Sequence, residues 1–202
     1  LIEEIFIPKS LIELKEGWCN GMFCLTKIII SPSNDQFIFK DDKYLFGKSN
    51  SNDEEFDILL FVKRLIDDIS IPPNVTKISE NVFSKCTRLQ KVEVPKNSNL
   101  QVIGENAFST TYIKEIFIPA SVTKICENAF SNCKNLTKVE IPKNSNLQII
   151  EKNAFSESKI EEIFIPASVT KICENAFYNC LSLTKVEIPA NSNLQIIENN
   201  AF

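Results

Sequence analysis

The chain has 202 residues, with 22 lysines and arginines against 26 aspartates and glutamates, and its formal net charge is −4. No basic patch stands out, which argues against nucleic acid as a partner, and no apolar run reaches the roughly 18 residues of a membrane-spanning helix. Histidine is absent, which removes the commonest general base, the commonest metal ligand and any Ser-His or Cys-His nucleophile pair, so we expect a protein that is not an enzyme and holds no cofactor and no metal.

Residues 1–31 contain one and a half imperfect copies of a motif that recurs through the chain. The segment IEEIFIPKS at residues 2–10 matches residues 160–168, and its apolar residues alternate with polar ones as in a strand with one buried face. Farther along, Trp18 stands where later copies have alanine, and Cys19 stands where they have phenylalanine. We therefore expect degenerate coils at the N-terminal end.

Residues 32–64 interrupt the repeat. Apolar triplets at residues 37–39 and 44–46 flank the polar segment 40–43, which predicts a β-hairpin, and residues 58–62 predict a third strand after a polar loop. Two readings of this insertion stay open, a decorated coil and a protruding recognition element. The acidic loop lacks the D-x-D-x-D-G spacing of a calcium site, so no metal is expected there.

Residues 65–202 repeat themselves every 47 positions. Residues 113–155 return almost unchanged as residues 160–202, and a looser copy occupies residues 66–108. Each period divides into coils of 23 and 24 residues that open with the pattern apolar-x-x-apolar-x-apolar-Pro. Proline ends the strand because it has no backbone N–H to donate. Such repeats predict a solenoid, in which each unit buries its apolar face against the next.

We expect parallel strands in these repeats and little α-helix. The predicted strands are residues 92–94, 116–118, 139–141, 163–165 and 186–188, and a second short strand is predicted at each segment like SVTKI. One phenylalanine per coil is predicted to stack in the core, namely Phe83, Phe108, Phe130, Phe155, Phe177 and Phe202. One asparagine per coil is expected to satisfy backbone groups of a turn, namely Asn81, Asn106, Asn128, Asn153, Asn175 and Asn200.

The seven cysteines follow the same period. One column contains Cys86, Cys133 and Cys180, which lie two coils apart, or ~9.6 Å, beyond the ~7 Å limit between Cα atoms of a disulfide. Cys126 and Cys173 are separated in the same way. We expect these thiols to be unbridged and to serve as small buried apolar groups, with Thr111 and Ser158 filling the position in alternate coils. A bridge within one coil, such as Cys126–Cys133, stays open.

The segment IPASVTKICENAFSNC at residues 118–133 fits the pattern I-P-x-S-V-T-x-I-x-x-x-A-F-x-x-C, and the chain thereby resembles the BspA-like (Treponema-type) class of leucine-rich repeat proteins. The long exit segment PKNSNLQII resembles members from parasitic protists more than bacterial members. This resemblance implies a right-handed parallel β-solenoid, a place at the cell surface or outside the cell, and a role in adhesion.

We expect one mainly β solenoid domain over residues 1–202, with about eight coils of 23–24 residues. The chain starts at Leu1 and stops at Phe202 in the middle of a coil, so we expect a fragment of a longer chain.

In each strand two residues point away from the core, and stacking in register aligns them in two columns. The first alternates in sign along Glu4, Lys27, Asp68, Lys91, Glu115, Lys138, Glu162 and Lys185. The second is Phe6, Ile29, Ser70, Glu93, Phe117, Glu140, Phe164 and Glu187.

Aromatic rings surrounded by polar groups are typical of binding hot spots. We therefore predict a partner-binding site formed by Phe6, Phe117, Phe164, Glu140, Glu187, Lys138 and Lys185. Two alternatives stay open: the rings only cover the alkyl stems of lysines, or the NSN loops at residues 97–99, 144–146 and 191–193 carry the function.

The sequence thus favours a non-catalytic surface module that binds a host protein, an extracellular-matrix protein or a neighbouring cell. The alternative is a structural spacer or self-assembling scaffold, which leaves a homo-oligomer open. Asn74 and Asn135 each begin an N-x-[ST] sequon and are candidates for glycosylation if the protein enters a secretory pathway.

Overall fold

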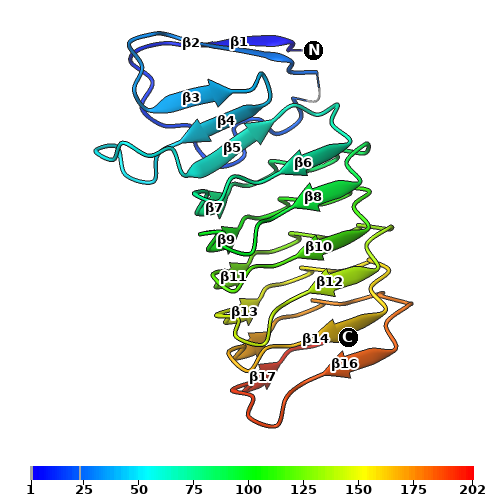
Figure 1. Ribbon diagram of the computed structural model, residues 1–202. Coiled ribbons are helices and arrows are strands. Elements are labelled where there is room, and N and C mark those ends of the chain that lie inside the picture. Colours follow the sequence, from blue (N-terminus) through cyan, green and yellow to red (C-terminus); the bar gives the residue numbers. More distant parts are fainter. Residues whose placement is uncertain (1, 23) are drawn as a thin grey trace.

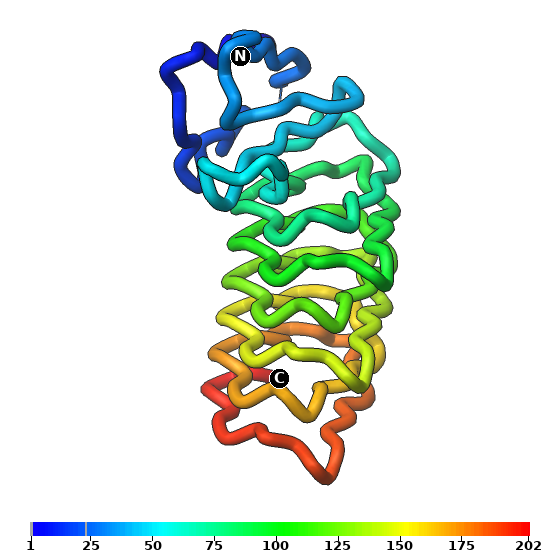
Figure 2. Tube along the Cα trace, turned by 60° about the vertical axis from the view of Figure 1, so that its left-hand side comes forward, coloured from blue at the N-terminus to red at the C-terminus, as the bar shows by residue number. Residues whose placement is uncertain are grey.

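The computed structural model describes residues 2–22 and 24–202, and this part of the chain forms strands, turns and loops but no helix. Successive coils follow one axis, so the molecule is an elongated β-solenoid (Figures 1 and 2). The expected solenoid of parallel strands is confirmed. In the described part of the chain, no helix has the length and apolar character needed to cross a membrane.

The strands are β1 (Glu4–Ile7), β2 (Lys27–Ile30), β3 (Phe37–Lys40), β4 (Tyr44–Gly47), β5 (Ile58–Val62), β6 (Asp68–Ser70), β7 (Lys77–Ile78), β8 (Lys91–Glu93), β9 (Val102–Ile103), β10 (Glu115–Phe117), β11 (Lys124–Ile125), β12 (Lys138–Glu140), β13 (Ile149–Ile150), β14 (Glu162–Phe164), β15 (Lys171–Ile172), β16 (Lys185–Glu187) and β17 (Ile196–Ile197).

One side of the solenoid carries the strands that precede the prolines. They form the sheets β1-β2, β6-β8 and β10-β12-β14-β16, in which every pairing is parallel. The predicted strands of the regular repeats are present, but each begins and ends one residue earlier than expected. The apolar residue before the proline packs inward in the inner coils and donates a further backbone bond in several of them, as Ile118 N does to Glu140 O at 2.9 Å and Ile165 N does to Glu187 O at 2.9 Å. The proline after it cannot continue the ladder.

The other side is a nine-stranded sheet in the order β17-β15-β13-β11-β9-β7-β5-β4-β3. Its strands from β7 onward have two residues each. Those from β7 to β15 pair in parallel with strands on both sides, as β11 does with β9 and β13, and β17 pairs with β15 at the edge. Ile125 of β11 is fully buried and Lys124 is half-buried, as strand alternation requires. The predicted short second strand is confirmed, and it also occurs at β9, β13 and β17.

The predicted column of phenylalanines runs through the core. Neighbouring rings from Phe83 to Phe202 have centroids 4.7 to 5.3 Å apart and lie within 9° of parallel. Because the coils repeat at almost the same distance, each of the four inner rings fills the space between two others. Phe202 stacks on Phe177 but is 47% exposed, so the expectation that it lies in the core is wrong. The column therefore joins every regular coil to the next.

The asparagine column occupies the left-handed backbone region. All six residues have φ between 52° and 59°, a conformation that asparagine tolerates better than most residues. The side-chain amide of Asn81 donates to the Glu80 carboxylate at 2.7 Å, not to a turn backbone group. The expected role is thus corrected, because these residues supply backbone geometry.

A second left-handed position follows four residues later in each turn. It is occupied by Lys85, Thr110, Asn132, Glu157 and Asn179, with φ of 59° or 60°. The backbone N–H at this position still donates to the next coil, as Thr110 N does to Ser131 O at 2.9 Å. The ladder between coils therefore imposes a conformation that lysine, threonine and glutamate do not favour.

The insertion folds as the predicted hairpin and third strand. β3 pairs with β4 and β4 with β5 in antiparallel fashion, and β5 then pairs in parallel with β7. Tyr44 and Phe46 pack into the main core, whereas Leu45 packs into a second core that also contains Phe37. The hairpin lies between the N-terminal coils and the regular repeats (Figure 1), so the reading of it as a protruding recognition element is wrong for these strands. Apolar residues on both of its faces require cover on each side.

Arg64 closes the N-terminal end of the stack of turns. In the regular coils, the backbone N–H groups of one turn donate to carbonyl oxygens of the next turn. The first turn of the regular stack, residues 81–86, instead accepts from the buried guanidinium of Arg64. One nitrogen donates to the carbonyl oxygens of Asn81, Val82 and Ser84 at 3.2, 2.8 and 3.2 Å. The guanidinium also lies 5.5 Å from the centroid of the Phe61 ring.

All seven cysteines have free thiols, within coils as well as between them. The Cys133 sulfur donates to the Phe108 carbonyl oxygen at 3.1 Å and lies 3.3 Å from the Thr111 hydroxyl. Cys180 repeats this arrangement two coils farther on. The expectation of a purely apolar role at this position is therefore wrong. It is a hydrogen-bonding position, which explains why threonine and serine also occupy it.

Candidate protein-binding groove on the strand face

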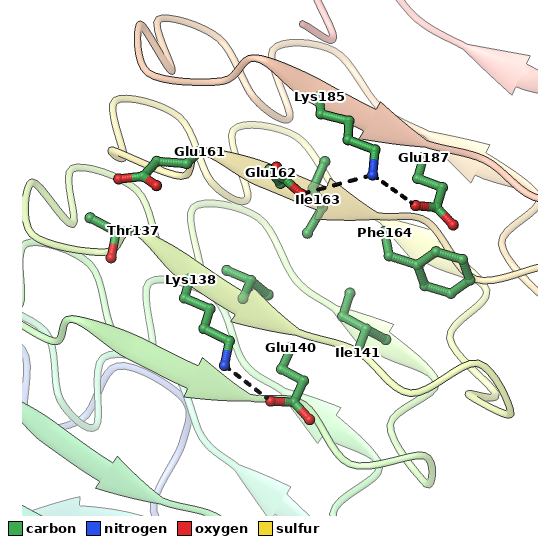
Figure 3. Close-up of a pocket in the computed structure, with 11 residues that line it drawn as sticks. Thr137, Lys138, Glu140, Ile141, Glu161, Glu162, Ile163, Phe164, Lys185 and Glu187 are labelled. Carbon is green, nitrogen blue, oxygen red and sulfur yellow. Dashed lines mark ion pairs between the residues drawn. The ribbon is translucent and has the colours of Figure 1, made fainter.

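The outer side of strands β8, β10, β12, β14 and β16 is hollowed. Two adjacent depressions of about 670 and 340 Å³ follow one another along the solenoid axis and share Lys138 and Glu140 as the wall between them. Together they are called the strand-face groove. Its outward side chains are Lys91, Glu93, Glu115, Phe117, Lys138, Glu140, Glu161, Glu162, Phe164, Lys185 and Glu187. Inward apolar residues such as Val139 and Ile141 form its floor. Figure 3 shows the larger depression, with Lys138, Glu140, Phe164, Lys185 and Glu187 on neighbouring strands.

The first column has the predicted register within each sheet, but it is not one series from Glu4 to Lys185, because the hairpin interrupts it after Lys27. Lys138 lies opposite Glu115 on one side and Glu162 on the other. The lysines, however, also turn along their own strands: Lys138 pairs with Glu140 at 3.6 Å, and Lys185 pairs with Glu187 at 3.2 Å as well as with Glu162 at 3.9 Å (Figure 3). These exposed pairs orient side chains more than they stabilise the fold.

The second column places its aromatic rings beside carboxylates. Phe117 lies opposite Glu140, and Phe164 lies opposite Glu187. Both residues were expected to point away from the core, and the structure has their rings half-buried on the outer face. Each ring has neighbouring strands on both sides, and their side chains cover part of it. No lysine or arginine of residues 2–22 and 24–202 lies over either ring.

Phe6 lies apart from the other predicted site residues. It is 61% exposed on β1, which pairs only with β2, and the hairpin separates this small sheet from the strand-face groove (Figure 1). The structure therefore brings together Phe117, Phe164, Glu140, Glu187, Lys138 and Lys185, but not Phe6.

The strand-face groove is acidic. Three lysines and six glutamates line it. The lysines at 138 and 185 are paired within the groove, whereas the carboxylates of Glu93, Glu115 and Glu161 have no ion-pair partner in the described part of the chain. The predicted binding site did not include these three glutamates. Glu93 and Glu115 belong to the two outward columns and Glu161 directly precedes β14, so the sequence pattern already placed them on the outer face.

The other chemically active groups have structural roles. Burial raises the pKa of Cys126 and of Cys133 to about 11, so both thiols are protonated near neutral pH and are poor nucleophiles. In the acidic loop, the Asp57 carboxylate accepts bonds from Ser49 N and the Thr76 hydroxyl. No group of three or more acidic or cysteine side chains suited to a metal occurs among the described residues.

The remaining candidates also have defined environments. The NSN loops use their serine for the turn: Ser98 and Ser145 are buried and accept the N–H two residues later at 3.1 Å. Asn74 and Asn135 are both exposed, and the Asn74 amide donates to the Phe56 carbonyl oxygen at 3.1 Å. Glycosylation stays a prediction. We expect Asn135 to be the better acceptor, because the Asn74 amide is engaged in its hydrogen bond to Phe56.

Comparison with known proteins identifies the repeat. A family profile described as BspA type leucine rich repeat region, present in six copies, matches residues 55–180 and 101–202. A leucine-rich repeat protein from Eubacterium ventriosum has a similar structure, with a TM-score of 0.71, 18% identity, and coverage of 99% of this chain and 58% of that one.

The structure of the pneumococcal vaccine antigen PcpA is also similar, with a TM-score of 0.55, 24% identity, and coverage of 83% of this chain and 42% of that one. This chain thus matches less than two thirds of either protein, and these likenesses concern the fold. A comparison with curated proteins gave no match.

Proposed function

Because the chain belongs to the BspA-type leucine-rich repeat family, we propose that it is a non-catalytic module of a cell surface that binds a protein partner in the strand-face groove. The groove itself carries the proposal: in each of its two adjacent depressions a half-buried aromatic ring lies beside a carboxylate. Partly buried aromatic anchors within a polar rim are typical of binding hot spots.

The proposed partner is a host protein, an extracellular-matrix protein or a component of a neighbouring cell. Family membership supports the surface location, and PcpA, which shares the fold, is described as a vaccine antigen. Adhesion is the biological role that follows from such a location and such a partner.

The test compares three forms of the purified chain: the wild type, the Phe117→Ser/Phe164→Ser double variant, and Tyr178→Ser. Tyr178 is an exposed aromatic residue outside the groove and serves as the matched control. Each form is applied to a panel of immobilised extracellular-matrix proteins and to host cells. We expect the wild type and the control to bind at least one member, and the double variant to lose that binding.

Two results would overturn the proposal. If the folded double variant binds every partner as the wild type does, the site lies elsewhere. If no form binds any member and the chain self-associates as its concentration rises, the scaffold reading is favoured instead.

A further inference from the structure

The strand-face groove repeats one recognition unit every second coil. Phe117 has Glu140 as its cross-strand neighbour, and Phe164 has Glu187. Between these units the pairing of Lys138 with Glu162 keeps the strands in register, which places Glu140 beside Phe164 as well. Each aromatic ring thus has at least one carboxylate next to it, and Glu140 lies next to both rings. Glu140 and Glu187 already form exposed ion pairs with Lys138 and Lys185, so a ligand cation would share these carboxylates.

This unit is complementary to a cationic side chain. An ammonium or guanidinium over an aromatic ring is attracted by the electrons of the ring, and an adjacent carboxylate adds an ion pair. The chain leaves the faces of Phe117 and Phe164 without a cation of its own among the described residues. It also leaves the carboxylates of Glu93, Glu115 and Glu161 unpaired, in a groove where glutamates outnumber lysines.

The spacing of the units selects the backbone conformation of a ligand. The stacked core rings of Phe108, Phe130 and Phe155 lie 5.1 Å apart at each step, so two coils span about 10 Å. A polyproline II helix rises ~3.1 Å per residue and repeats every three residues, so its side chains recur every ~9.3 Å on one face. Same-face residues of a β-strand recur every ~6.7 Å, which is too short, whereas two turns of an α-helix cover ~10.8 Å. Of the two conformations that fit, polyproline II is the one that docks in aromatic-lined grooves with little loss of conformational entropy.

We propose that the strand-face groove binds an extended, basic segment of a partner protein in which arginine or lysine recurs at every third residue, so that successive cations lie over Phe117 and Phe164. This inference rests on the proposed function and specifies the chemistry of the partner. The cation over Phe164 lies between Glu140 and Glu187, and the one over Phe117 lies beside Glu140. The intervening residues of the segment, for which proline is best suited, follow the groove floor.

The test uses labelled synthetic peptides and fluorescence anisotropy. One peptide repeats Arg-Pro-Pro four times. A second has the same number of arginines but one more proline in each repeat, and a third replaces each arginine of the first peptide with glutamate. We expect the first peptide to bind most tightly. The second should bind about tenfold more weakly, because the distance between its arginines no longer matches the distance between Phe117 and Phe164. The third should not bind.

Variants of the chain then locate the site. The Phe117→Ser/Phe164→Ser variant should weaken binding of the first peptide about tenfold or more, since two aromatic anchors are lost. Glu140→Gln should weaken it severalfold and reduce its dependence on salt, because one carboxylate shared by both units is neutralised. Tyr178→Ser should leave binding unchanged. Circular dichroism and thermal unfolding establish that each variant is folded.

Any of three outcomes would overturn the inference. The first is binding that is indifferent to arginine spacing and to the groove variants, which indicates general attraction to an acidic surface. The second is no binding by the folded wild type. A matrix protein that needs Phe117 and Phe164 but is not displaced by the first peptide would refute this inference and leave the proposed function standing.

Discussion

At the scale of single residues, Phe130 and Phe164 illustrate two uses of the same side chain. Phe130 is fully buried, with the centroids of Phe108 and Phe155 each 5.1 Å away and the rings within 2° of parallel. Phe130→Ala opens a cavity between the two neighbouring rings, and we expect it to lower the free energy of unfolding by about 3–5 kcal/mol. Denaturant-induced unfolding measures this change.

The half-buried rings of Phe117 and Phe164 on the strand face are the comparison for the buried ring of Phe130. The Phe117→Ser/Phe164→Ser variant should unfold at a higher denaturant concentration than Phe130→Ala, because its rings keep part of their surface in water. If both variants unfold equally easily, the assignment of Phe117 and Phe164 to the outer face is wrong.

Arg64 supplies hydrogen bonds that no backbone group supplies at this point of the stack. Arg64→Met keeps much of the side-chain volume but leaves the carbonyl oxygens of Val82 and Ser84 without the guanidinium donor. We expect a loss of about 1–3 kcal/mol in the free energy of unfolding for the unsatisfied buried groups. Arg88→Met is the control, since Arg88 forms an exposed pair with Asp67 and should matter much less. Equal effects of the two variants in urea unfolding would refute this role for Arg64.

At the scale of elements, the turns store strain at their second left-handed position. Thr110 has φ of 60°, which is costly for a β-branched residue, whereas asparagine occupies the same position at Asn132. Thr110→Asn should therefore raise the free energy of unfolding by about 1 kcal/mol, and Asn132→Thr should lower it by a similar amount. Thermal unfolding of both variants is the measurement. Effects of the same sign would contradict the backbone explanation.

These turns also mark the limit of prediction from sequence. The strands, the hairpin and the phenylalanine column follow from alternation and period, because those patterns reflect which side chains are buried. The left-handed conformation of Lys85 and Glu157 has no such signal, since the residue types do not favour it. It arises from hydrogen bonds to the next coil, which only the assembled stack provides.

The strand-face groove was predictable in part. Register alone places Phe117 beside Glu140 and Phe164 beside Glu187, and the structure has this arrangement. The partial burial of both rings depends on how the flanking side chains lie, which register does not specify. The separation of Phe6 from the groove depends on the hairpin lying within the stack, although the unbroken apolar run Tyr44–Leu45–Phe46 was a signal that this strand is buried on both faces.

At the scale of the whole molecule, the hairpin divides the solenoid into two unequal cores. The main core contains 42 buried residues of the described chain and the N-terminal core contains eight, so the two ends differ greatly in the apolar surface that holds them. The smaller core also buries the indole N–H of Trp18 without a hydrogen-bond partner in the described part of the chain. In repeat proteins each unit is stabilised mainly by its neighbours, so stability can differ along the stack.

We therefore expect the N-terminal coils to open before the regular repeats. In hydrogen exchange followed by mass spectrometry, amides of residues 2–31 should exchange faster than amides of residues 113–177 that are equally hydrogen-bonded, because local opening there exposes less apolar surface. Arg64→Met should accelerate exchange at residues 81–86 and in the N-terminal coils, since Arg64 lies at the junction between the two cores, and should leave residues 113–177 unchanged. Uniform protection along the chain, or acceleration by Arg64→Met throughout, would mean that the two cores unfold as one unit.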